Sequence, residues 1–264
     1  MLRTSFKSVS KPAGRDIFDI DVAWLDRAQA FAGIKKALAS KGQTIVAFLN
    51  AHNANQAMIN NDYHHALEHC TVLPDGIGVD LAARALYGAP FPANLNGTDF
   101  IPALLAYLTK PSRIALIGAQ PDVLAEATQA FQRDIPWHEF IAVSDGYFNK
   151  DDNGKILDEL AALKPDIVLV AMGSPTQELW IENNIGEEHG KVVISVGALF
   201  DFVSERVPRA PDIFRRLRGE WIFRLWWEPR RLWRRYILGN PLFLFRVLRY
   251  KYLRRSNTGG QATA

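Results

Sequence analysis

Short runs rich in β-branched residues alternate with segments of helix length, and this alternation restricts the fold more than any other feature of the chain. The runs predict strands at residues 43–50, 113–117, 138–143, 166–171 and 191–196. The segments between them predict helices at 53–70, 79–87, 98–108, 121–133, 154–163 and 175–184. Strands and helices that alternate in this way form a parallel sheet with helices on both faces. We therefore predict a doubly wound α/β fold.

The first residues of three helices agree with this interpretation. Thr98 and Asp99 form a predicted N-cap pair ahead of an apolar run. Pro121 and Pro175 suit the first turn of a helix, where the N–H that proline lacks would have no partner.

The basic residues gather near the C-terminus. Residues 206–255 hold 15 of the 31 Lys and Arg residues and three acidic ones, a formal charge of +12, whereas the rest of the chain carries −9. This asymmetry indicates an anionic partner for the basic segment. A membrane surface, a nucleic acid and a phosphorylated substrate all meet that requirement.

Cysteine content and apolar runs bear on the cellular compartment. Cys70 is the single cysteine, so nothing indicates an oxidising compartment. The N-terminus lacks the apolar stretch of a signal peptide. No apolar run reaches the roughly 18 residues that a membrane-spanning helix needs. We expect a cytoplasmic protein.

In a doubly wound sheet, ligands bind beyond the carboxyl ends of the strands. Asp75 lies between a predicted strand and a helix, with Gly76 and Gly78 allowing a ligand to approach the backbone closely. Its carboxylate could serve as a general base or as a helix N-cap, and the sequence favours neither role over the other.

Glycine turns follow three of the predicted strands. Gly118 and Gly173 each precede a proline that opens a helix, a geometry that leaves N–H groups free for a phosphate. Gly146 and Tyr147 follow the strand at 138–143. Neither proline turn completes a dinucleotide-binding or P-loop motif, so an ordinary tight turn is the more common interpretation.

Metal chemistry has little support. His65 and His69 are four residues apart next to His64, but without cysteine or carboxylate partners this spacing favours a surface helix over a zinc site. Asp151 and Gly154 bound a polar turn whose spacing does not fit a calcium loop. We predict no metal.

The segment from residue 219 to 236 combines four tryptophans with arginines at helical spacing and a break at Pro229. A continuous helix would place Arg224, Arg231 and Arg234 roughly along one side, where guanidinium groups can clamp a diphosphate. The same composition suits a helix at a membrane interface. A solvated charged face with its aromatic residues packed on the core is the third interpretation.

Six motifs together resemble the WecG/TagA/CpsF family of bacterial glycosyltransferases over residues 19–248. In order they are PDGIGVD at 74–80, NGTDF at 96–100, GSPTQELW at 173–180, VGALFDF at 196–202, RAP at 209–211, and EWIFRLWWEPRRLWRRY from Glu220. The resemblance implies a Rossmann-like core with a basic, aromatic, helical appendage at its C-terminus. It also implies inverting transfer from a UDP-sugar to a polyprenyl-diphosphate-linked saccharide on the inner face of the cytoplasmic membrane, with neither metal nor cofactor.

The resemblance also assigns roles to residues. Asp75 matches the proposed base and Gln177 a second catalytic position. The implied substrate-binding residues are Asn50, Gly118, Gly146, Tyr147, Gly173, Pro175, Glu178, Arg224, Arg231 and Arg234. Phe48 stands where many members have threonine, and residues 94–96 lack an arginine that many members carry. These departures affect the identity of donor or acceptor.

These observations predict four parts of the chain and leave two rival functions. The parts are an N-terminal extension at 1–18, the glycosyltransferase core at 19–205, a membrane-associating appendage at 206–255 and a disordered tail at 256–264.

A non-catalytic assembly factor for surface polysaccharide would keep the fold without needing Asp75. A nucleic-acid-binding protein would share the basic segment, but no known motif is present and the acidic core would repel the phosphate backbone. We expect no nucleic acid partner. The donor is expected to carry a hexose, N-acetylhexosamine or uronic acid, and the appendage could pack on a lipid surface or on a second copy of the chain.

Overall fold

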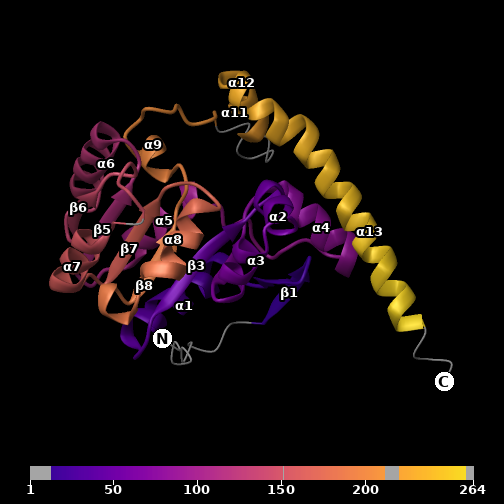
Figure 1. Ribbon diagram of the computed structural model, residues 1–264, viewed down its shortest axis with the longest axis horizontal. Coiled ribbons are helices and arrows are strands. Elements are labelled where there is room, and N and C mark those ends of the chain that lie inside the picture. Colours follow the sequence, from indigo (N-terminus) through magenta and orange to yellow (C-terminus); the bar gives the residue numbers. More distant parts are fainter. Residues whose placement is uncertain (1–12, 151, 212–219, 260–264) are drawn as a thin grey trace.

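An eight-stranded sheet forms the centre of the computed structural model, which describes residues 13–150, 152–211 and 220–259 (Figure 1). The strand order is β1-β2-β4-β3-β8-β7-β5-β6, and every neighbouring pair is parallel except the antiparallel pair of β1 and β2. The strands are β1 (Gly14–Ile17), β2 (Ile20–Ala23), β3 (Thr44–Leu49), β4 (Thr71–Pro74), β5 (Arg113–Gly118), β6 (Glu139–Ser144), β7 (Ile167–Ala171) and β8 (Val192–Ser195).

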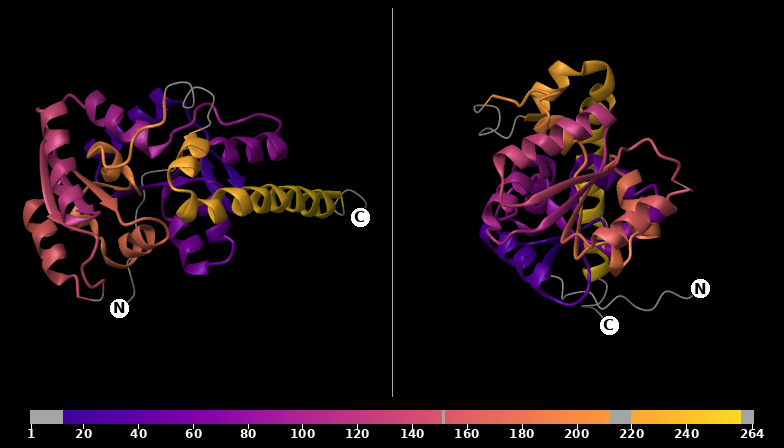
Figure 2. Two further views of the ribbon diagram at one scale, coloured as in Figure 1. Left: turned by 90° about the horizontal axis from the view of Figure 1, so that it is seen from above. Right: turned by 90° about the vertical axis from the view of Figure 1, so that its left-hand side faces the viewer.

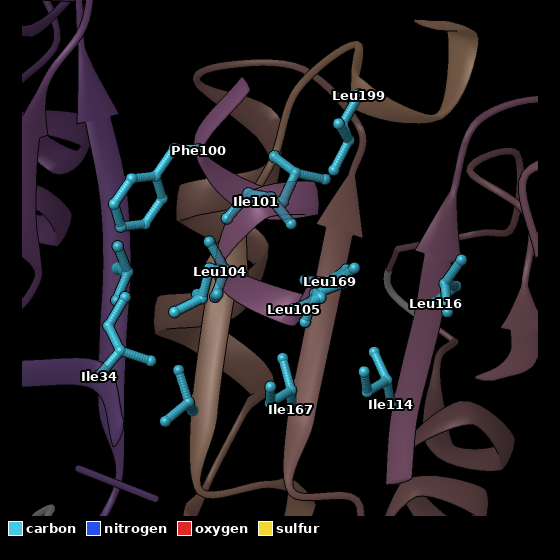
Figure 3. Close-up of a cluster of buried hydrophobic side chains, with 14 of the residues drawn as sticks. Ile34, Phe100, Ile101, Leu104, Leu105, Ile114, Leu116, Ile167, Leu169 and Leu199 are labelled. Carbon is cyan, nitrogen blue, oxygen red and sulfur yellow. The ribbon is translucent and has the colours of Figure 1, made fainter. Parts of the chain in front are cut away.

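Helices cover both faces of this sheet, because successive strand residues point to opposite sides. In β7, Ile167 and Leu169 pack into a cluster on one face, whereas Val168 and Val170 pack into a cluster on the other. The first face is covered by α1 (Arg27–Ala39), α5 (Gly97–Tyr107), α6 (Pro121–Asp134) and α9 (Leu199–Val203). Figure 3 shows how Phe100, Leu104 and Leu105 of α5 lie over the strand residues of this face.

The opposite face is covered by more helices, including the last one of the chain. These are α2 (Ala51–Ala57), α3 (Asn61–Glu68), α4 (Ile77–Tyr87), α7 (Gly154–Leu163), α8 (Thr176–Asn184) and α13 (Gly239–Gly259). The doubly wound α/β prediction is confirmed, and the five predicted strands and the helices at 79–87, 98–108, 121–133, 154–163 and 175–184 are present with ends within two residues of those predicted.

Two strands were not predicted, and a third, β4, was expected ahead of Asp75 but was given no bounds. β4 has four residues and ends in proline, which conceals it from a search for long β-branched runs. β1 and β2 form a hairpin around Phe18 and Asp19, both with positive φ. Such turns usually carry glycine or asparagine, so the sequence gives no turn signal here. The sheet therefore begins before residue 19.

Two predictions about helices were wrong. The single helix expected at 53–70 is two helices, because the Asn60 side chain accepts a hydrogen bond from the Tyr63 N–H and starts α3 anew. The N-cap of α5 is Asn96, whose side chain accepts from the Asp99 N–H, so Thr98 and Asp99 are not the cap. Asp151 of the predicted polar turn lies outside the described residues.

The C-terminal segment folds as α11 (Glu220–Trp227), α12 (Pro229–Trp233), a π-helical turn (Arg234–Leu238) and α13. α13 lies along α2 and α4, and its C-terminal end extends past the rest of the fold (Figures 1 and 2). It is anchored by Phe243 and Val247, both fully buried among residues of α2, α4 and the β1–β2 turn. The Phe243 ring meets the Phe18 ring edge-on at 5.6 Å. The helix reaches Gly259, inside the range predicted as a disordered tail.

The opposite side of these helices is apolar and exposed. The exposed side chains are Ile222, Trp226, Trp227, Trp233, Ile237, Leu238, Leu242, Leu244, Phe245, Leu248, Tyr252 and Leu253. We call this set the apolar ridge. In the part of the chain that the structure describes, no helix is long and apolar enough to cross a membrane.

Candidate active site

A cleft lies at the carboxyl ends of β3, β4 and β8, closed on one side by the C-terminal helices. It has two lobes, with cavity volumes of about 160 and 230 Å³. The α13 lobe is lined by Asn94, Asn96, Trp221, Tyr236 and Asn240, and the β8 lobe by Gly173, Ser174, Gln177, Glu178 and residues 195–198. Asn50, His52, Asp75, Thr98, Arg224 and Arg235 line both lobes and mark their junction.

Asp75 is held at this junction by the ends of two parallel strands. It follows β4 directly, and its N–H donates to the carbonyl oxygen of Leu49, the last residue of β3, at 2.9 Å. The next residue, Gly76, has a φ of 89°, a left-handed conformation that glycine adopts without strain. The Gly76 N–H donates to Asn94 Oδ1 at 2.7 Å. The sharp turn after β4 therefore directs the carboxylate into the cleft.

Asn50 orients the carboxylate of Asp75. Its Oδ1 accepts from the N–H groups of His52 and Asn53, which makes it the N-cap of α2. The amide nitrogen is thereby turned toward Asp75 and donates to Oδ2 at 3.1 Å. One asparagine thus caps a helix and fixes a carboxylate at the same time.

Burial raises the pKa of the Asp75 carboxyl above its usual value. The hydrogen bond from Asn50 and the positive charges of Arg235 and Arg224 oppose this rise. A carboxylate with a raised pKa is a stronger base than one in water, and the nearby cations favour its ionised form. The geometry suits proton abstraction at the lobe junction.

Of the two roles that the sequence left open for Asp75, the structure removes the cap. The N-cap of α4 is Gly76, which has no side chain to accept from the first turn of that helix. Gly78 lines the α13 lobe and also has a packing role. A Cβ on Gly78 would stand 2.9 Å from the Cβ of Ala51, so this glycine lets α4 approach α2 closely and serves helix packing.

Gln177 and Glu178 form the wall of the β8 lobe. Gln177 Oε1 accepts from the Gly197 N–H at 3.0 Å, and its Nε2 donates to Glu178 Oε1 at 2.8 Å. Ser174 Oγ donates to the same Oε1 at 2.9 Å. Both ends of the Gln177 amide are therefore occupied by the protein itself, and the side chain ties α8 to the loop after β8.

The motifs around this cleft agree with a comparison against known protein families. The family model described as glycosyl transferase WecG/TagA/CpsF matches residues 15–257. The chain belongs to this family. Its membership makes the protein a glycosyltransferase, confirms the resemblance drawn from the motifs, and decides against the non-catalytic and nucleic-acid-binding alternatives.

Two curated relatives of the glycosyltransferase bear the same name. The N-acetylglucosaminyldiphosphoundecaprenol N-acetyl-beta-D-mannosaminyltransferase of Bacillus spizizenii is 36% identical over 214 residues, which cover 80% of this chain and 81% of that protein. Its namesake in Bacillus subtilis is 33% identical over 207 residues, covering 78% of this chain and 79% of that protein. The names of these relatives give N-acetylglucosaminyldiphosphoundecaprenol as the acceptor and N-acetyl-β-D-mannosamine as the sugar transferred.

The arginines of the glycosyltransferase differ from the predicted row at one position. Arg224, Arg231 and Arg235 line the cleft, whereas Arg234 is exposed and stacks on the Trp233 ring. The prediction assumed one regular helix. The chain instead breaks at Glu228 before Pro229 and then makes a π-helical turn, in which the Gly239 N–H donates to the Arg234 carbonyl. Together these features change the helical phase and bring Arg235 to the cleft.

His52 is a cleft residue that the sequence did not single out. It occupies the first turn of α2, and burial together with the charge of Arg235 lowers its pKa to about 4. The imidazole is therefore neutral at physiological pH and presents one N–H donor and one acceptor to the lobe junction. Its place two residues after Asn50, beyond a strand end, is the signal that would have found it.

Besides Arg234, four of the predicted binding residues do not line this cleft. Gly118 has a φ of 119°, and a Cβ there would lie 2.2 Å from the Ala171 carbonyl oxygen, so it allows β5 and β7 to end close together. The Gly146 N–H donates to the Ala119 carbonyl at 2.8 Å, and Tyr147 is exposed beside it. These three lie beyond β5 and β6, while Pro175 precedes α8.

His65 of α3 and His69, the C-cap of that helix, are exposed, as predicted for a surface helix, whereas His64 is partly buried and contacts the Phe18 carbonyl oxygen at 3.0 Å. His65 contacts Glu68 and His69 contacts Glu182, each at 3.0 Å. Within the described ranges, no cluster of three His, Cys, Asp or Glu side chains has the arrangement of a metal site.

Proposed function

We propose that this glycosyltransferase transfers a sugar from a UDP-sugar to a hydroxyl group of a polyprenyl-diphosphate-linked saccharide, with inversion at the anomeric carbon. The observation that carries the proposal is the position of Asp75 at the junction of two lobes, facing Arg224 and Arg235. The relatives act on N-acetylglucosaminyldiphosphoundecaprenol by name, which supports the class of acceptor.

The two lobes suit different substrates. The β8 lobe lies over the carboxyl ends of β3 and β8, where sheets of this type bind nucleotides. We assign it to the donor sugar and its diphosphate, with the glycine turns beyond β5 and β6 available for the nucleoside. The α13 lobe is built partly from the C-terminal helices that carry the apolar ridge. We assign it to the lipid-linked acceptor.

In the reaction, the acceptor hydroxyl attacks the anomeric carbon from the face opposite the UDP group. A new C–O bond forms, the bond from that carbon to the β-phosphate oxygen breaks, and Asp75 takes the hydroxyl proton. UDP departs with the electron pair. Asn50 holds the Asp75 carboxylate in place, and Gln177 acts as a positioning residue through Gly197.

Negative charge develops on the leaving diphosphate and must be offset. Arg224, Arg231 and Arg235 line the donor lobe. Guanidinium groups bind phosphate oxygens through charge-assisted hydrogen bonds, which are strong. The buried Nε atoms of Arg224 and Arg235 have no hydrogen-bond partner among the described residues.

The apolar ridge and the surrounding basic residues support peripheral binding to the anionic inner face of the cytoplasmic membrane. Trp226 is 81% exposed and Phe245 63% exposed, and exposed aromatic residues beside arginines suit the headgroup region. Sedimentation with anionic liposomes tests this part, while analytical ultracentrifugation without lipid tests whether a second copy of the chain covers the ridge instead.

The central experiment measures transfer with Asp75→Asn. A panel of UDP-sugars, including UDP-N-acetylmannosamine, is offered with a synthetic polyprenyl-diphosphate N-acetylglucosamine, and products are read by mass spectrometry. Loss of a general base lowers kcat by about 10²- to 10⁴-fold. Asp134→Asn, an exposed aspartate at the end of α6, is the matched control. Activity of Asp75→Asn at the level of that control would exclude Asp75 as the base.

A further inference from the structure

A second carboxyl group faces the donor lobe, in surroundings unlike those of Asp75. Glu178 lies in the first turn of α8 and is only 3% exposed. Its Oε1 accepts two hydrogen bonds, from Ser174 Oγ at 2.9 Å and from Gln177 Nε2 at 2.8 Å. Its Oε2 is buried and has no hydrogen-bond partner in the described part of the chain.

The groups packed around Glu178 are polar but uncharged. Tyr63 faces it from α3, Ser195 from β8, and Asn53 of α2 donates to Ser174 at 3.3 Å. Of these only Tyr63 titrates, and burial holds its pKa above the ordinary range. The arginines of the cleft (Arg224, Arg231 and Arg235) line the same lobe, yet in the structure as described none forms an ion pair with Glu178.

A negative charge on the carboxyl group is therefore stabilised differently at Asp75 and at Glu178. Asp75 receives an amide hydrogen bond and the field of two guanidinium groups, whereas Glu178 has neutral neighbours and one oxygen without a donor. Burying an ionised carboxylate without a cation is far more costly than burying the neutral acid. A proton on Oε2 would turn this atom into a donor. The nearby Ser195 hydroxyl, which donates to the Val46 carbonyl oxygen at 3.3 Å, is neutral in either state.

We propose that Glu178 is a neutral carboxylic acid that positions the donor lobe by joining Ser174, Gln177 and the Gly197 loop into one wall. In this state it adds no negative charge beside the diphosphate that the lobe is proposed to hold. Burial, which raises the pKa of Glu178, supports the same conclusion. The functional consequence rests on the proposed function; the protonation state does not.

The pH dependence of donor binding follows from the negative charge that Glu178 gains when it ionises. As pH rises through the raised pKa of Glu178, the carboxyl loses its proton, and a negative charge then faces the donor diphosphate. Donor binding weakens, so kcat/KM falls on the alkaline side. Glu178→Gln keeps a neutral side chain of the same size and cannot ionise, which removes this fall.

Infrared spectroscopy of the full-length protein tests the protonation state directly. At pH 7, wild type should show a carboxylic acid C=O band that disappears in Glu178→Gln. The band should persist in Asp75→Asn and in Glu182→Gln, a matched change one turn further along α8. Absence of the band in wild type, or its survival in Glu178→Gln, overturns the proposal. This readout needs no substrate and stands even if none of the tested sugars is transferred.

Kinetics test the positioning role. Glu178→Gln should lose the alkaline fall and should raise donor KM less than Glu178→Ala does. Glu178→Ala should raise donor KM by about tenfold or more, because Ser174 and Gln177 lose a shared partner. Circular dichroism establishes that each variant is folded. If the folded Gln variant is as impaired as the Ala variant, or keeps the alkaline fall, Glu178 does not act as a neutral acid.

Discussion

Removing the amide of Asn50 should move the acid side of the pH–activity profile to higher pH. The amide nitrogen donates to Asp75 Oδ2 at 3.1 Å, and this bond favours the ionised carboxylate that serves as base. Its loss raises the pKa of Asp75 further, so more alkaline solution is needed to deprotonate the base. Both Asn50→Ala and Asn50→Ser should show the shift.

The size of the shift follows from the strength of the bond. A hydrogen bond to a charged group contributes about 1.5–3 kcal/mol, and 3.1 Å is long for a charge-assisted bond, which selects the lower value. One pKa unit corresponds to about 1.4 kcal/mol. We therefore expect the acid midpoint of kcat/KM to rise by about one pH unit.

The assay is release of UDP against pH, with thermal unfolding in parallel. Asn50 also caps α2, so Asn50→Ala should cost about 1 kcal/mol of stability, while serine retains capping capacity. Asp26→Ala removes a cap from α1, on the other face of the sheet, and should lower stability without moving the midpoint. An unchanged midpoint in both Asn50 variants, or a shift in Asp26→Ala, would refute the assignment of Asp75 as the titrating base.

The remaining predictions concern the C-terminal helices and their contact with the core. Arg235→Ala should lower kcat/KM by at least about tenfold, because one charge-assisted hydrogen bond to phosphate is lost. Arg234→Ala should change kcat/KM little, because that side chain stacks on Trp233 outside the cleft. Equal effects of the two substitutions in the UDP-release assay would contradict these positions. Phe243→Ala should lower the free energy of unfolding by about 3–5 kcal/mol, since this ring is fully buried, while Phe245→Ala should leave denaturant unfolding unchanged and weaken liposome binding. Gly78→Ala should destabilise the fold by about 1–3 kcal/mol because its methyl group meets α2, and a neutral result in urea titration would show that the two helices can separate freely.

The strand-end rule located much of the cleft from sequence. Asp75 and Gly173 were selected because they follow predicted strands, and Asn50, the last residue of the predicted strand at 43–50, through the family resemblance. The parallel register places them at one edge of the sheet. The identity of the family followed from motifs in the same places. The rule could not say which of the strand ends lie together around one cleft. Gly118 and Gly146 also follow strands, yet they lie beyond β5 and β6 and outside the cleft.

The failures have local physical causes. The Phe18–Asp19 turn has no glycine and is stabilised by tertiary packing of Phe18 against Phe243 and Tyr250, residues more than two hundred positions away. The break before α3 depends on one hydrogen bond, which the Asn60 side chain accepts from the Tyr63 N–H. Periodicity treats a helix as regular, so it could not anticipate which arginine of the C-terminal segment reaches the site.

The π-helical turn at Arg234–Leu238 carries a consequence for how such a site can change over time. The backbone hydrogen bond of a π-helical turn spans five residues, one more than that of a regular α-helix. A single insertion or deletion in this turn would therefore rotate the side chains before it by about 100° relative to those after it. The residues of α13 that pack on α2 and α4 would keep their contacts, while a different arginine would point toward the proposed phosphate positions. Members of this family could therefore change their substrate preference through an insertion or deletion at this one turn, without substitution of the residues proposed to perform the chemistry.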